Sequence, residues 1–238
     1  MTLPQHPAPL PESPDTAVGP ADDGSGSGLF VAFEGGDGAG KSTQTALLAQ
    51  ALTALGYTVL RTREPGGTPV GEQLRSLVLE HGNGEIDARC EALIFAASRA
   101  AHAAQVIRPA LAGGQVVLTD RYIDSSVAYQ GAGRELGPEQ IRSLNEWATG
   151  GLRPDLTVLL DVDPADGRTR RNAGAAPDAA EGGEDRLESE PDAFHSRIRH
   201  AFLELAAAAP EHYLVLSAQD PIDVLAGQIL DRVKQLLP

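Results

Sequence analysis

The sequence predicts a three-layer α/β fold in which helices flank a five-stranded parallel sheet. Five short, nearly continuous apolar runs alternate with stretches of helical pattern, which is typical of parallel strands buried on both faces. A glycine-rich turn directly follows the first run and opens a helical stretch, an arrangement that favours phosphate binding. The apolar runs lie at 29–34, 57–63, 115–120, 156–162 and 213–217.

Helical stretches separate these runs along the chain. The first begins at Lys41 and continues to about Leu55, and Gly56 then supplies a helix stop. The others predict helices at about 70–80, 87–112, 125–131, 138–149, 192–209 and 221–237. Because each strand is separated from the next by helical sequence, the strands are expected to run parallel rather than as hairpins.

Two segments lack this periodicity. Residues 1–28 hold six prolines, four glycines and no Lys or Arg, which predicts a disordered tail. The segment Asn172–Glu184 has no large apolar residue and predicts a mobile surface loop. We therefore expect residues 29–238 to form a single domain.

The chain is acidic and almost free of lysine. Its 238 residues include 33 acidic and 19 basic side chains, so the formal net charge is 19 − 33 = −14. Seventeen of the basic residues are arginine, and the lysines are Lys41 and Lys234. Such a charge argues against nucleic-acid or anionic-membrane partners, which require many cations, but a small anion could still bind in a locally basic pocket.

Cysteine content and hydropathy indicate the compartment. The single cysteine, Cys90, cannot form an internal disulfide, and no segment has the pattern of a signal peptide. No apolar run approaches the length of a membrane-spanning helix. Cytoplasmic residence is the simplest expectation.

A phosphate-binding loop is the strongest local signal. The segment 35–42 fits the pattern G-x-x-x-x-G-K-[ST] between a predicted strand and a predicted helix. Its backbone N–H groups and the helix N-terminus would cradle a polyphosphate, Lys41 would bridge the β- and γ-phosphates, and Ser42 would ligate Mg²⁺. A chance glycine-rich turn is the alternative. The candidate nucleotide-binding residues are Gly35, Gly36, Asp37, Gly38, Ala39, Gly40, Lys41, Ser42 and Thr43.

Charged clusters follow three further strands. They begin at Arg63, Asp120 and Asp161, and in a parallel sheet such strand ends open onto the phosphate-loop side. A guanine-specific GTPase normally carries an Asn-Lys-x-Asp motif. The chain has lysines only at 41 and 234, and neither lies in such a motif. The guanine-specific GTPase is therefore disfavoured, and the three clusters look like ligand-binding strand ends.

Several motifs together resemble the thymidylate kinase family, in order and spacing, from about residue 29 to the C-terminus. Beyond the phosphate loop through Thr43, they are Arg63-Glu64-Pro65-Gly66-Gly67-Thr68, Phe95 to Arg99 with His102, Asp120-Arg121-Tyr122, Ser125 to Gly131, Pro154 to Val162, and Asp185-Arg186-Leu187-Glu188. The resemblance implies a P-loop nucleoside monophosphate kinase fold. It also implies transfer of the γ-phosphoryl group of ATP to dTMP, giving dTDP and ADP with Mg²⁺, in dTTP biosynthesis. Family members are usually homodimers.

The residue chemistry suits phosphoryl transfer between two polyanions, whose repulsion must be offset by cations and metal. Arg121 is the best candidate to grip the acceptor phosphate, with Arg63 near it; surface salt bridges are the alternative. The resemblance implies that Asp37 lies near the acceptor sugar and phosphate, although an Asp in a turn is also common. Asp120 stands where a P-loop enzyme often holds Mg²⁺ through water.

Two later segments hold the candidate residues for binding the base and the sugar. Phe95 could stack on a pyrimidine and Arg99, one turn later, could bind its O4 carbonyl, although Phe95 alone would more often belong to the core. The resemblance implies that Tyr129 disfavours a ribose 2′-hydroxyl. Ser125, Ser126 and Gln130 could bind the sugar or base. We expect His102 and the other histidines, which lack metal-ligand spacing, to be ordinary surface or helix residues.

The resemblance implies that a lid at about 166–190 supplies catalytic cations, as in family members whose phosphate loop contains no Arg. The candidates are Arg168, Arg170, Arg171 and Arg186, and their closure would also exclude water. Arginines that merely solvate a helix are the alternative. Arg168 and Arg170 cannot both face the phosphates at a spacing of two.

Three departures from the family pattern stand out. Ser98 replaces the acidic or amide residue that often precedes the matching Arg, the segment 172–184 extends the lid, and the tail has no counterpart. Two other functions stay open: a kinase for another nucleoside monophosphate or a deoxynucleoside, and a non-catalytic ATP-binding module. Arg99 and Asp120-Arg121-Tyr122 weigh against the first, and Lys41, Asp37 and the lid arginines weigh against the second.

Overall fold

Five parallel strands form the centre of the computed structural model, which describes residues 28–174 and 185–237. The sheet order is β2-β3-β1-β4-β5, so the strand that leads into the phosphate loop is the middle one. This confirms the predicted α/β fold. The strands are β1 (Leu29–Glu34), β2 (Val59–Arg63), β3 (Val116–Asp120), β4 (Leu156–Asp161) and β5 (Tyr213–Ser217).

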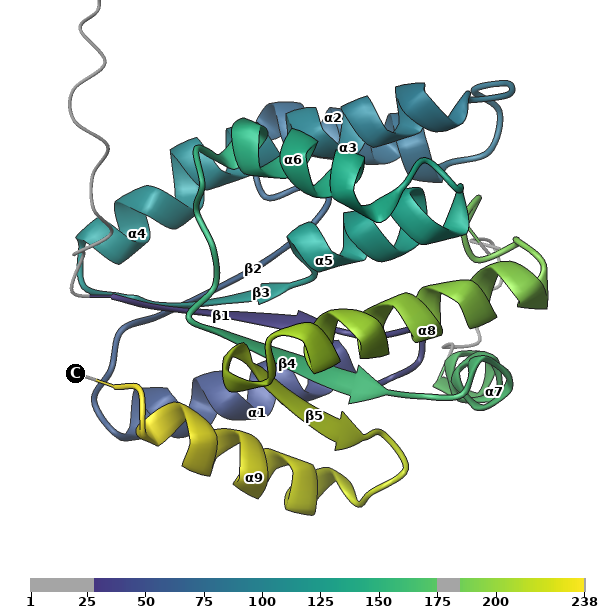
Figure 1. The fold of residues 1–238 in the computed structure, drawn as a ribbon. Coiled ribbons are helices and arrows are strands. Elements are labelled where there is room, and N and C mark those ends of the chain that lie inside the picture. The colour runs from purple at the N-terminus through teal and green to yellow at the C-terminus, as the bar shows by residue number, and fades with distance from the viewer. Residues whose placement is uncertain (1–27, 175–184, 238) are drawn as a thin grey trace, which may run out of the picture.

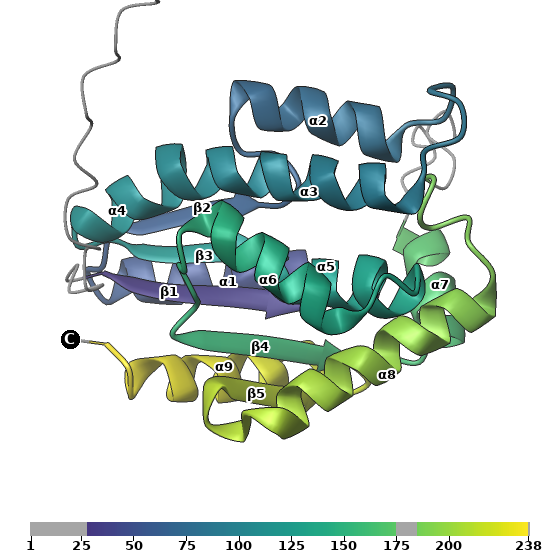
Figure 2. The ribbon, with the colours of Figure 1, turned by 45° about the horizontal axis from the view of Figure 1, so that its top comes forward.

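Helices cover both faces of this sheet. Figures 1 and 2 show α1 and α9 against one face, with α2, α3, α5, α6 and α8 on the other side. The longer helices are α1 (Lys41–Ala54), α2 (Pro69–Leu79), α3 (Ala88–His102), α6 (Pro138–Thr149), α7 (Pro164–Gly174), α8 (Asp192–Ala208) and α9 (Ile222–Lys234). The short helices are α4 (Arg108–Ala112) and α5 (Ile123–Ser126).

Alternate residues of β1 serve the two hydrophobic layers. Val31 and Phe33 pack with α1 and α9, whereas Phe30 and Ala32 pack with the helices of the opposite face. All of β1 is buried, since successive side chains point to opposite faces and both faces are covered. The central strand is therefore held from both sides, and the loop that follows it starts from a rigid base.

Strand register gathers the chemically active residues at one edge of the sheet. Phe33 of β1 pairs with Asp120 of β3, and Arg63 of β2 pairs with the same Asp120. On the other side, Glu34 pairs with Leu159 of β4. The segments that follow these strands thus start side by side at the carboxyl ends, where parallel sheets bind ligands.

Helix starts agree with the capping chemistry of the sequence. Thr68 caps α2 by accepting a hydrogen bond from Gly71 N at 3.0 Å, with Pro69 in the first turn. Asp87 caps α3 through the N–H groups of Arg89 and Cys90. These caps fix where the helices behind β2 begin.

The structure differs from the expected elements in several places. The helix expected at 87–112 consists of α3, a π-helical segment Ala103–Ile107, and α4, where Pro109 lacks the N–H of a regular helix. The helix expected at 125–131 is α5 followed by a π-helical segment Val127–Gly133. The strand expected from residue 57 begins at Val59.

The lid region contains a helix that we did not anticipate. Helix α7 occupies 164–174, so the segment expected to be a loop from Asn172 begins inside it. Residues 175–184, and the tail through residue 27, lie outside the described residues. Within the described part of the chain, no helix has the length and apolar character needed to cross a membrane.

Candidate active site

The phosphate loop connects the central strand to α1. Gly40 has a φ of 93°, a left-handed conformation that suits glycine and turns the chain into α1. Lys41, buried to 7% exposure, donates hydrogen bonds to the carbonyls of Gly35 at 3.0 Å and Gly36 at 2.9 Å. Its ammonium group is therefore held over the loop, where phosphates would enter.

Ser42 and Asp120 meet beside the loop. The Ser42 hydroxyl donates to Oδ2 of Asp120 at 2.6 Å, although the two residues lie 78 positions apart. Strand register brings them together, because Asp120 ends β3 next to β1. The pair offers a hydroxyl and a carboxylate oxygen at one point, a hard-oxygen donor set of the kind Mg²⁺ prefers.

Arg121 links the phosphate loop to the segment after β3. Its Nη2 donates to Asp37 Oδ1 at 2.5 Å and to the Tyr129 hydroxyl at 3.2 Å. Its Nη1 donates to the Ser125 hydroxyl at 3.0 Å and to the Gly35 carbonyl at 3.2 Å. Tyr129 in turn donates to Asp37 Oδ2 at 3.1 Å, so one network fixes all of these side chains.

The backbone of Arg121 is unusual. Its φ of 69° lies in the left-handed region, which costs energy for a residue with a side chain. Neighbouring groups hold it there: its N–H donates to the Phe33 carbonyl at 2.9 Å, and its carbonyl accepts from the Thr119 hydroxyl at 2.9 Å. The surrounding fold thus enforces a conformation that turns the guanidinium toward the phosphate loop.

Charges around Asp37 favour its ionised form. Burial opposes ionisation, but Arg121, Lys41 and the Tyr129 hydrogen bond outweigh it and lower the pKa of Asp37 to about 2. Burial and the nearby Arg121 lower the pKa of Lys41. Despite its burial, neighbouring acidic groups keep the pKa of Arg121 well above its ordinary value. Asp37 and Arg121 therefore form a permanent ion pair at neutral pH.

Glu34, which was not predicted from the sequence, forms hydrogen bonds with the segment that follows Arg121. Its carboxylate accepts from the Tyr122 N–H at 2.8 Å, the Ser125 N–H at 3.2 Å and the Ser125 hydroxyl at 2.6 Å. Burial, with the nearby Asp124, raises the pKa of Glu34 to about 7. Its position at the end of a buried apolar strand was a sequence signal for this role, because a buried carboxylate needs hydrogen-bond partners.

A cavity of about 170 Å³, called the smaller cavity below, opens beside this network. Apolar and polar side chains line it together, which suits a ring with polar edges. Each residue predicted to bind the base or sugar lies on its wall. Those residues are Phe95, Arg99, Ser125, Ser126, Tyr129 and Gln130, and Asp37 and Arg121 complete the inner end.

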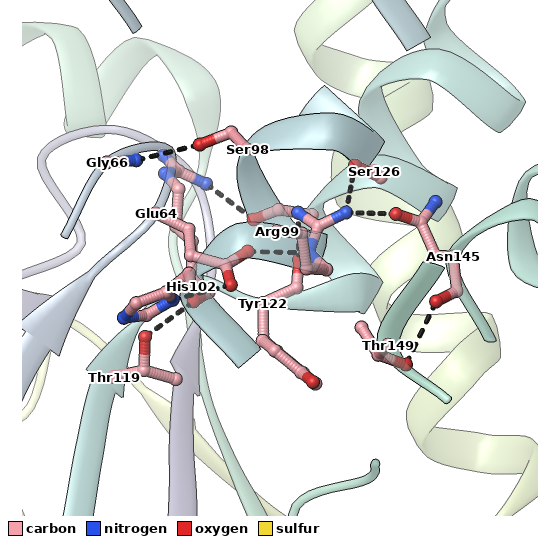
Figure 3. Close-up of polar contacts among 12 residues, drawn as sticks. Glu64, Gly66, Ser98, Arg99, His102, Thr119, Tyr122, Ser126, Asn145 and Thr149 are labelled. Carbon is pink, nitrogen blue, oxygen red and sulfur yellow. Dashed lines mark hydrogen bonds and ion pairs between the residues drawn. The ribbon is translucent and has the colours of Figure 1, made fainter. Parts of the chain in front are cut away.

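Arg99, which lines the smaller cavity, forms several of the contacts drawn in Figure 3. Only 2% exposed, it donates from Nε to Glu64 at 2.5 Å and from Nη1 to the Ser126 hydroxyl at 2.9 Å and to Asn145. Its Nη2 donates to the Tyr122 carbonyl at 3.0 Å. Among the described partners, these contacts leave only Nη2 with an N–H for a ligand.

Glu64 holds Arg99 from the strand β2 side. Its second oxygen lies 2.8 Å from Nδ1 of His102, whose Nε2 lies 2.6 Å from the Thr62 hydroxyl. His102 lies on α3 but is fully buried, so it is not the ordinary residue that we expected. Ser98, which departs from the family pattern, accepts from the Gly66 N–H at 3.1 Å and so anchors the turn after β2 (Figure 3).

A larger cavity of about 580 Å³ opens over the phosphate loop, and Lys41, Ser42, Thr43 and Asp120 line it. Arg63 also lines it, half exposed and paired with Glu72 at 2.9 Å. Arg75 of α2, which sequence reasoning missed, lines both cavities and donates to the Pro65 carbonyl at 3.0 Å. Periodicity placed it on a helix but gave no sign that it faces inward.

The lid arginines take different positions. Arg170 and Arg171 line the larger cavity, and Arg171 lies 3.5 Å from Glu188. Arg170 also donates to the Ala218 carbonyl at 2.5 Å. Arg168 pairs with Asp192 at 2.7 Å and lines a minor pocket beside Gly36. Arg186 pairs instead with buried Glu91 and is not among the residues lining these three cavities.

Helix α7 touches the phosphate loop through two glycines. A Cβ on Gly167 would stand 2.3 Å from the Asp37 carbonyl oxygen, and one on Gly38 would stand 2.0 Å from the Gly167 carbonyl oxygen. Any side chain at either position would force the two backbones apart. In Figure 2, α7 lies beyond the carboxyl end of β4, next to the start of α8.

Known proteins resemble this chain over most of its length. The family model described as "Thymidylate kinase" matches residues 33–229. A thymidylate kinase of Clavibacter sepedonicus is 54% identical over 211 residues, which cover 89% of this chain and 97% of that protein. One of Bifidobacterium longum is 52% identical over 213 residues, covering 88% of this chain and 99% of that protein.

A solved structure supports the same relationship. The crystal structure of thymidylate kinase from Ehrlichia chaffeensis matches with a TM-score of 0.69 and 31% sequence identity, over 87% of this chain and 98% of that one. The family model thus spans most of the chain, and the relatives are matched over nearly their whole lengths. With its phosphate loop, its pair of adjoining cavities and these relatives, the chain belongs to the thymidylate kinase family.

Proposed function

We propose that this chain transfers the γ-phosphoryl group of ATP to dTMP, giving dTDP and ADP. The observation that carries the proposal is a shared wall: the larger cavity over the phosphate loop and the smaller cavity have five lining residues in common, Asp37, Glu64, Arg75, Arg121 and Glu188. Two ligands bound in these cavities would bring their phosphates together at this wall. Phosphoryl transfer requires that proximity, and it requires cations to offset the repulsion.

The phosphate loop binds the donor. Backbone N–H groups of 35–43 and the N-terminus of α1 hold the β- and γ-phosphates, and Lys41 bridges them. Support comes from the Lys41 ammonium, which already lies against two loop carbonyls and can exchange them for phosphate oxygens. The loop itself supplies no arginine, so further cations come from other elements.

Mg²⁺ fits the donor side. Ser42 and Asp120 offer hydroxyl and carboxylate oxygens 2.6 Å apart at the edge of the larger cavity. The described residues hold no cluster of three acidic, His or Cys ligands, which agrees with an ion that keeps waters and binds substrate phosphates. When bound, the ion would neutralise charge on the transferring phosphoryl group, and Ser42 and Asp120 would hold it.

Arg121 and Asp37 position the acceptor phosphate. Arg121 stands at the shared wall with a permanent positive charge, and a guanidinium can hold two phosphate oxygens at once. Asp37 and Tyr129 keep its orientation through their hydrogen bonds. No strong general base is required, because the attacking phosphate oxygen is already ionised. Arg75 and Arg63 are further cations near this point.

The rest of the smaller cavity binds the nucleoside. Phe95 stacks on the pyrimidine, and the remaining N–H of Arg99 donates to its O4 carbonyl. Tyr129 lies against the ion pair of Asp37 and Arg121, where its ring restricts the space for a ribose 2′-hydroxyl. The sugar and base form hydrogen bonds with Ser125, Ser126 and Gln130.

The lid completes the site. Arg171 and Arg170 are the lid arginines best placed to reach the transferring phosphoryl group, since both line the larger cavity. Arg168 would need to leave Asp192, and Arg186 would need to leave Glu91, before either could do so. Closure of this region excludes water, whose attack would hydrolyse ATP.

We further propose a cytoplasmic homodimer. Cytoplasmic residence rests on the single cysteine, Cys90, which cannot form an internal disulfide. The dimer is supported by apolar side chains exposed on one helical layer: Leu93 of α3 is 58% exposed and Trp147 of α6 is 82% exposed. Exposed aromatic and aliphatic groups on neighbouring helices are typical of subunit interfaces.

A coupled ADP-release assay tests the reaction. The assay compares dTMP, dUMP, dCMP, dGMP and thymidine as acceptors with Mg·ATP, and we expect the highest kcat/KM with dTMP. Turnover of another nucleotide, with none of dTMP at saturation, would favour the kinase for a different nucleoside monophosphate. ATP binding with no acceptor turned over would favour a non-catalytic ATP-binding module.

A further inference from the structure

Glu91 is a buried carboxylate that the proposed roles do not use. It lies in the first turn of α3 and is fully buried, yet it lines neither of the two main cavities. A buried charge of this kind requires several partners, since its desolvation is otherwise costly. Its partners come from two separate parts of the chain, the segment 130–134 and Arg186.

These partners donate hydrogen bonds to both oxygens of the Glu91 carboxylate. Oε1 accepts from Gln130 Nε2 at 2.8 Å and from Arg134 Nε at 3.3 Å. Oε2 accepts from Arg134 Nη2 at 3.1 Å and from Arg186 Nη2. Each oxygen therefore receives two donors, which matches the capacity of an ionised carboxylate.

Gln130 is the partner that faces the smaller cavity. Its side chain has one donor end and one acceptor end, and both oxygens of Glu91 act as acceptors toward Gln130, Arg134 and Arg186. The amide nitrogen must therefore face Glu91. Among the described residues, none donates to Gln130 Oε1 in the hydrogen bonds found, so this oxygen is the end available to a ligand.

An acceptor at this point distinguishes pyrimidines. Thymine and uracil carry an N–H at N3 beside the O4 carbonyl, whereas cytosine carries an unprotonated N3 beside an amino group. Gln130 Oε1 can accept from the first pattern only, and the neighbouring Arg99 Nη2 can donate to O4 only. The opposite pattern would place acceptor against acceptor and donor against donor, which is the basis of strong rejection.

We propose that Glu91 is a positioning residue that locks the Gln130 amide with its oxygen toward the ligand and so makes the site select a base with an N3–H. This inference rests on the proposed function, because it concerns the acceptor nucleotide. Glu91 also binds Arg186. It attaches the segment 185–188 to the same carboxylate, and Asp185, Leu187 and Glu188 of that segment line the smaller cavity.

Glu91→Gln tests the lock. A glutamine at this position can donate as well as accept, so the Gln130 amide is free to turn and offer its nitrogen to the ligand. We expect the ratio of kcat/KM for dTMP to kcat/KM for dCMP to fall by about tenfold or more. An unchanged ratio in a folded variant that still uses dTMP overturns the inference.

Glu190→Gln is the matched control. Glu190 accepts from Arg134 Nη1 at 2.5 Å, so this variant removes the other carboxylate of the same arginine without touching Gln130. We expect its dTMP/dCMP ratio to equal that of the unaltered protein. An equal fall in both variants would assign the effect to general loosening of Arg134 and would overturn the lock.

A double-mutant cycle separates positioning from structure. Gln130→Met removes both ends of the amide, so adding Glu91→Gln to it should not change the dTMP/dCMP ratio further. If Glu91→Gln still alters the ratio in that background, Glu91 does not act through Gln130.

Binding to the unaltered protein covers the case in which Glu91→Gln fails to fold. We expect dTMP methylated at N3 to bind at least about a hundredfold more weakly than dTMP, because it cannot donate to Gln130 Oε1. Equal binding of the two overturns the inference. If the unaltered protein does not turn over dTMP at all, the proposed function fails first, and the two failures are thereby distinguished.

Discussion

Arg121 is the side chain that we propose to hold the acceptor phosphate. It reaches Asp37, Ser125, Tyr129 and the Gly35 carbonyl from a left-handed backbone position. Because it lies at the wall between the two cavities, its loss should affect the acceptor far more than the bound ATP. We expect Arg121→Ala to lower kcat/KM for dTMP by about a hundredfold or more, with the Kd for ATP changed less than about threefold.

Steady-state kinetics with isothermal titration of ATP measures both quantities for that variant. Arg153→Ala serves as the control, since it removes an equally long cation from the surface, where Arg153 pairs with Glu146. An equal loss of ATP binding and acceptor use in Arg121→Ala would show that the acceptor phosphate lies elsewhere.

Glu34 is expected to make stability depend on pH. Its pKa is raised from 4.5 to about 7 in the folded protein, so between these values the folded state binds a proton that the unfolded state has lost. The free energy of unfolding therefore falls by about 3 kcal/mol as the pH rises through this window, and the Glu34 contribution is absent at higher pH. Below pH 4.5 both states are protonated and the contribution is complete.

Glu34→Gln removes this titration. The amide oxygen can accept the Tyr122 and Ser125 N–H groups, and the Ser125 hydroxyl can accept from the amide nitrogen. Urea unfolding at pH 5 and pH 8 should show a smaller decrease in the variant than in the unaltered protein. Glu139→Gln, at an exposed side chain, controls for loss of a charge. Parallel pH profiles for all three proteins would contradict the assignment.

Sequence motifs identified residues that the structure brings together. Each of the six side chains predicted to bind base or sugar lines the smaller cavity, and Ser42 meets Asp120. Arg75 and Glu91 were missed because a single charged residue in a helix has no pattern that shows its inward direction, and Glu34 was missed although it ends a buried strand. His102 was misjudged for the same reason: its burial follows from Glu64, which is distant in sequence.

At the scale of elements, hydrophobic periodicity predicted strands and long helices well. The β1 boundaries at 29–34 and the α6 boundaries at 138–149 agree with those expected. Periodicity could not predict the π-helical segment Val127–Gly133, since one extra residue per turn leaves the composition unchanged. Tyr129 and Gln130 lie in that segment, so the directions of two cavity-lining side chains depend on a feature that hydrophobic periodicity does not reveal.

Helix α7 is positioned by a contact between backbones. Gly167→Ala would place a methyl group 2.3 Å from the Asp37 carbonyl oxygen, so α7 must move away from the phosphate loop. Displacement by about an ångström can cost catalysis about a hundredfold, and we expect kcat to fall by about tenfold to a hundredfold in stopped-flow or steady-state assays. The KM for dTMP should change much less, since Gly167 does not line the smaller cavity.

Gly227→Ala is the matched control for that substitution. Gly227 lies inside α9, and a Cβ there meets no atom within 4 Å. Alanine at this position should leave kcat unchanged and raise the melting temperature slightly, because alanine favours helix over glycine. An unchanged kcat in Gly167→Ala would show that the contact with the phosphate loop does not position the lid.

At the scale of the whole molecule, the exposed apolar groups of α3 and α6 predict association. Light scattering after size exclusion should give a mass about twice the chain's 24.9 kDa. Leu93→Arg or Trp147→Arg should shift this mass to that of one chain, because a buried unpaired charge opposes docking. Ile222→Arg, at a 59% exposed position on α9, should leave it unchanged. A single-chain mass for the unaltered protein would contradict the homodimer.

The distribution of charge agrees with a site for polyphosphates. Residues 1–28 carry −4 and residues 172–192 carry seven acids less Arg186, or −6, which leaves −4 for the rest of the chain. Most of the net negative charge therefore belongs to these two sequence segments. Around the two cavities, arginines from β2, α2, the end of β3 and α7 accumulate, as electrostatic attraction of anions requires.

The scarcity of lysine makes Lys41 chemically distinguishable. Apart from the α-amine, the chain carries only one other amine, on Lys234, which is exposed at the end of α9. Burial lowers the pKa of Lys41, so a larger share of its side chain is unprotonated and nucleophilic than in an exposed lysine. Acylating reagents would therefore have two well-separated side-chain targets, and protection of one relative to the other would report how much of the phosphate loop is occupied by nucleotide.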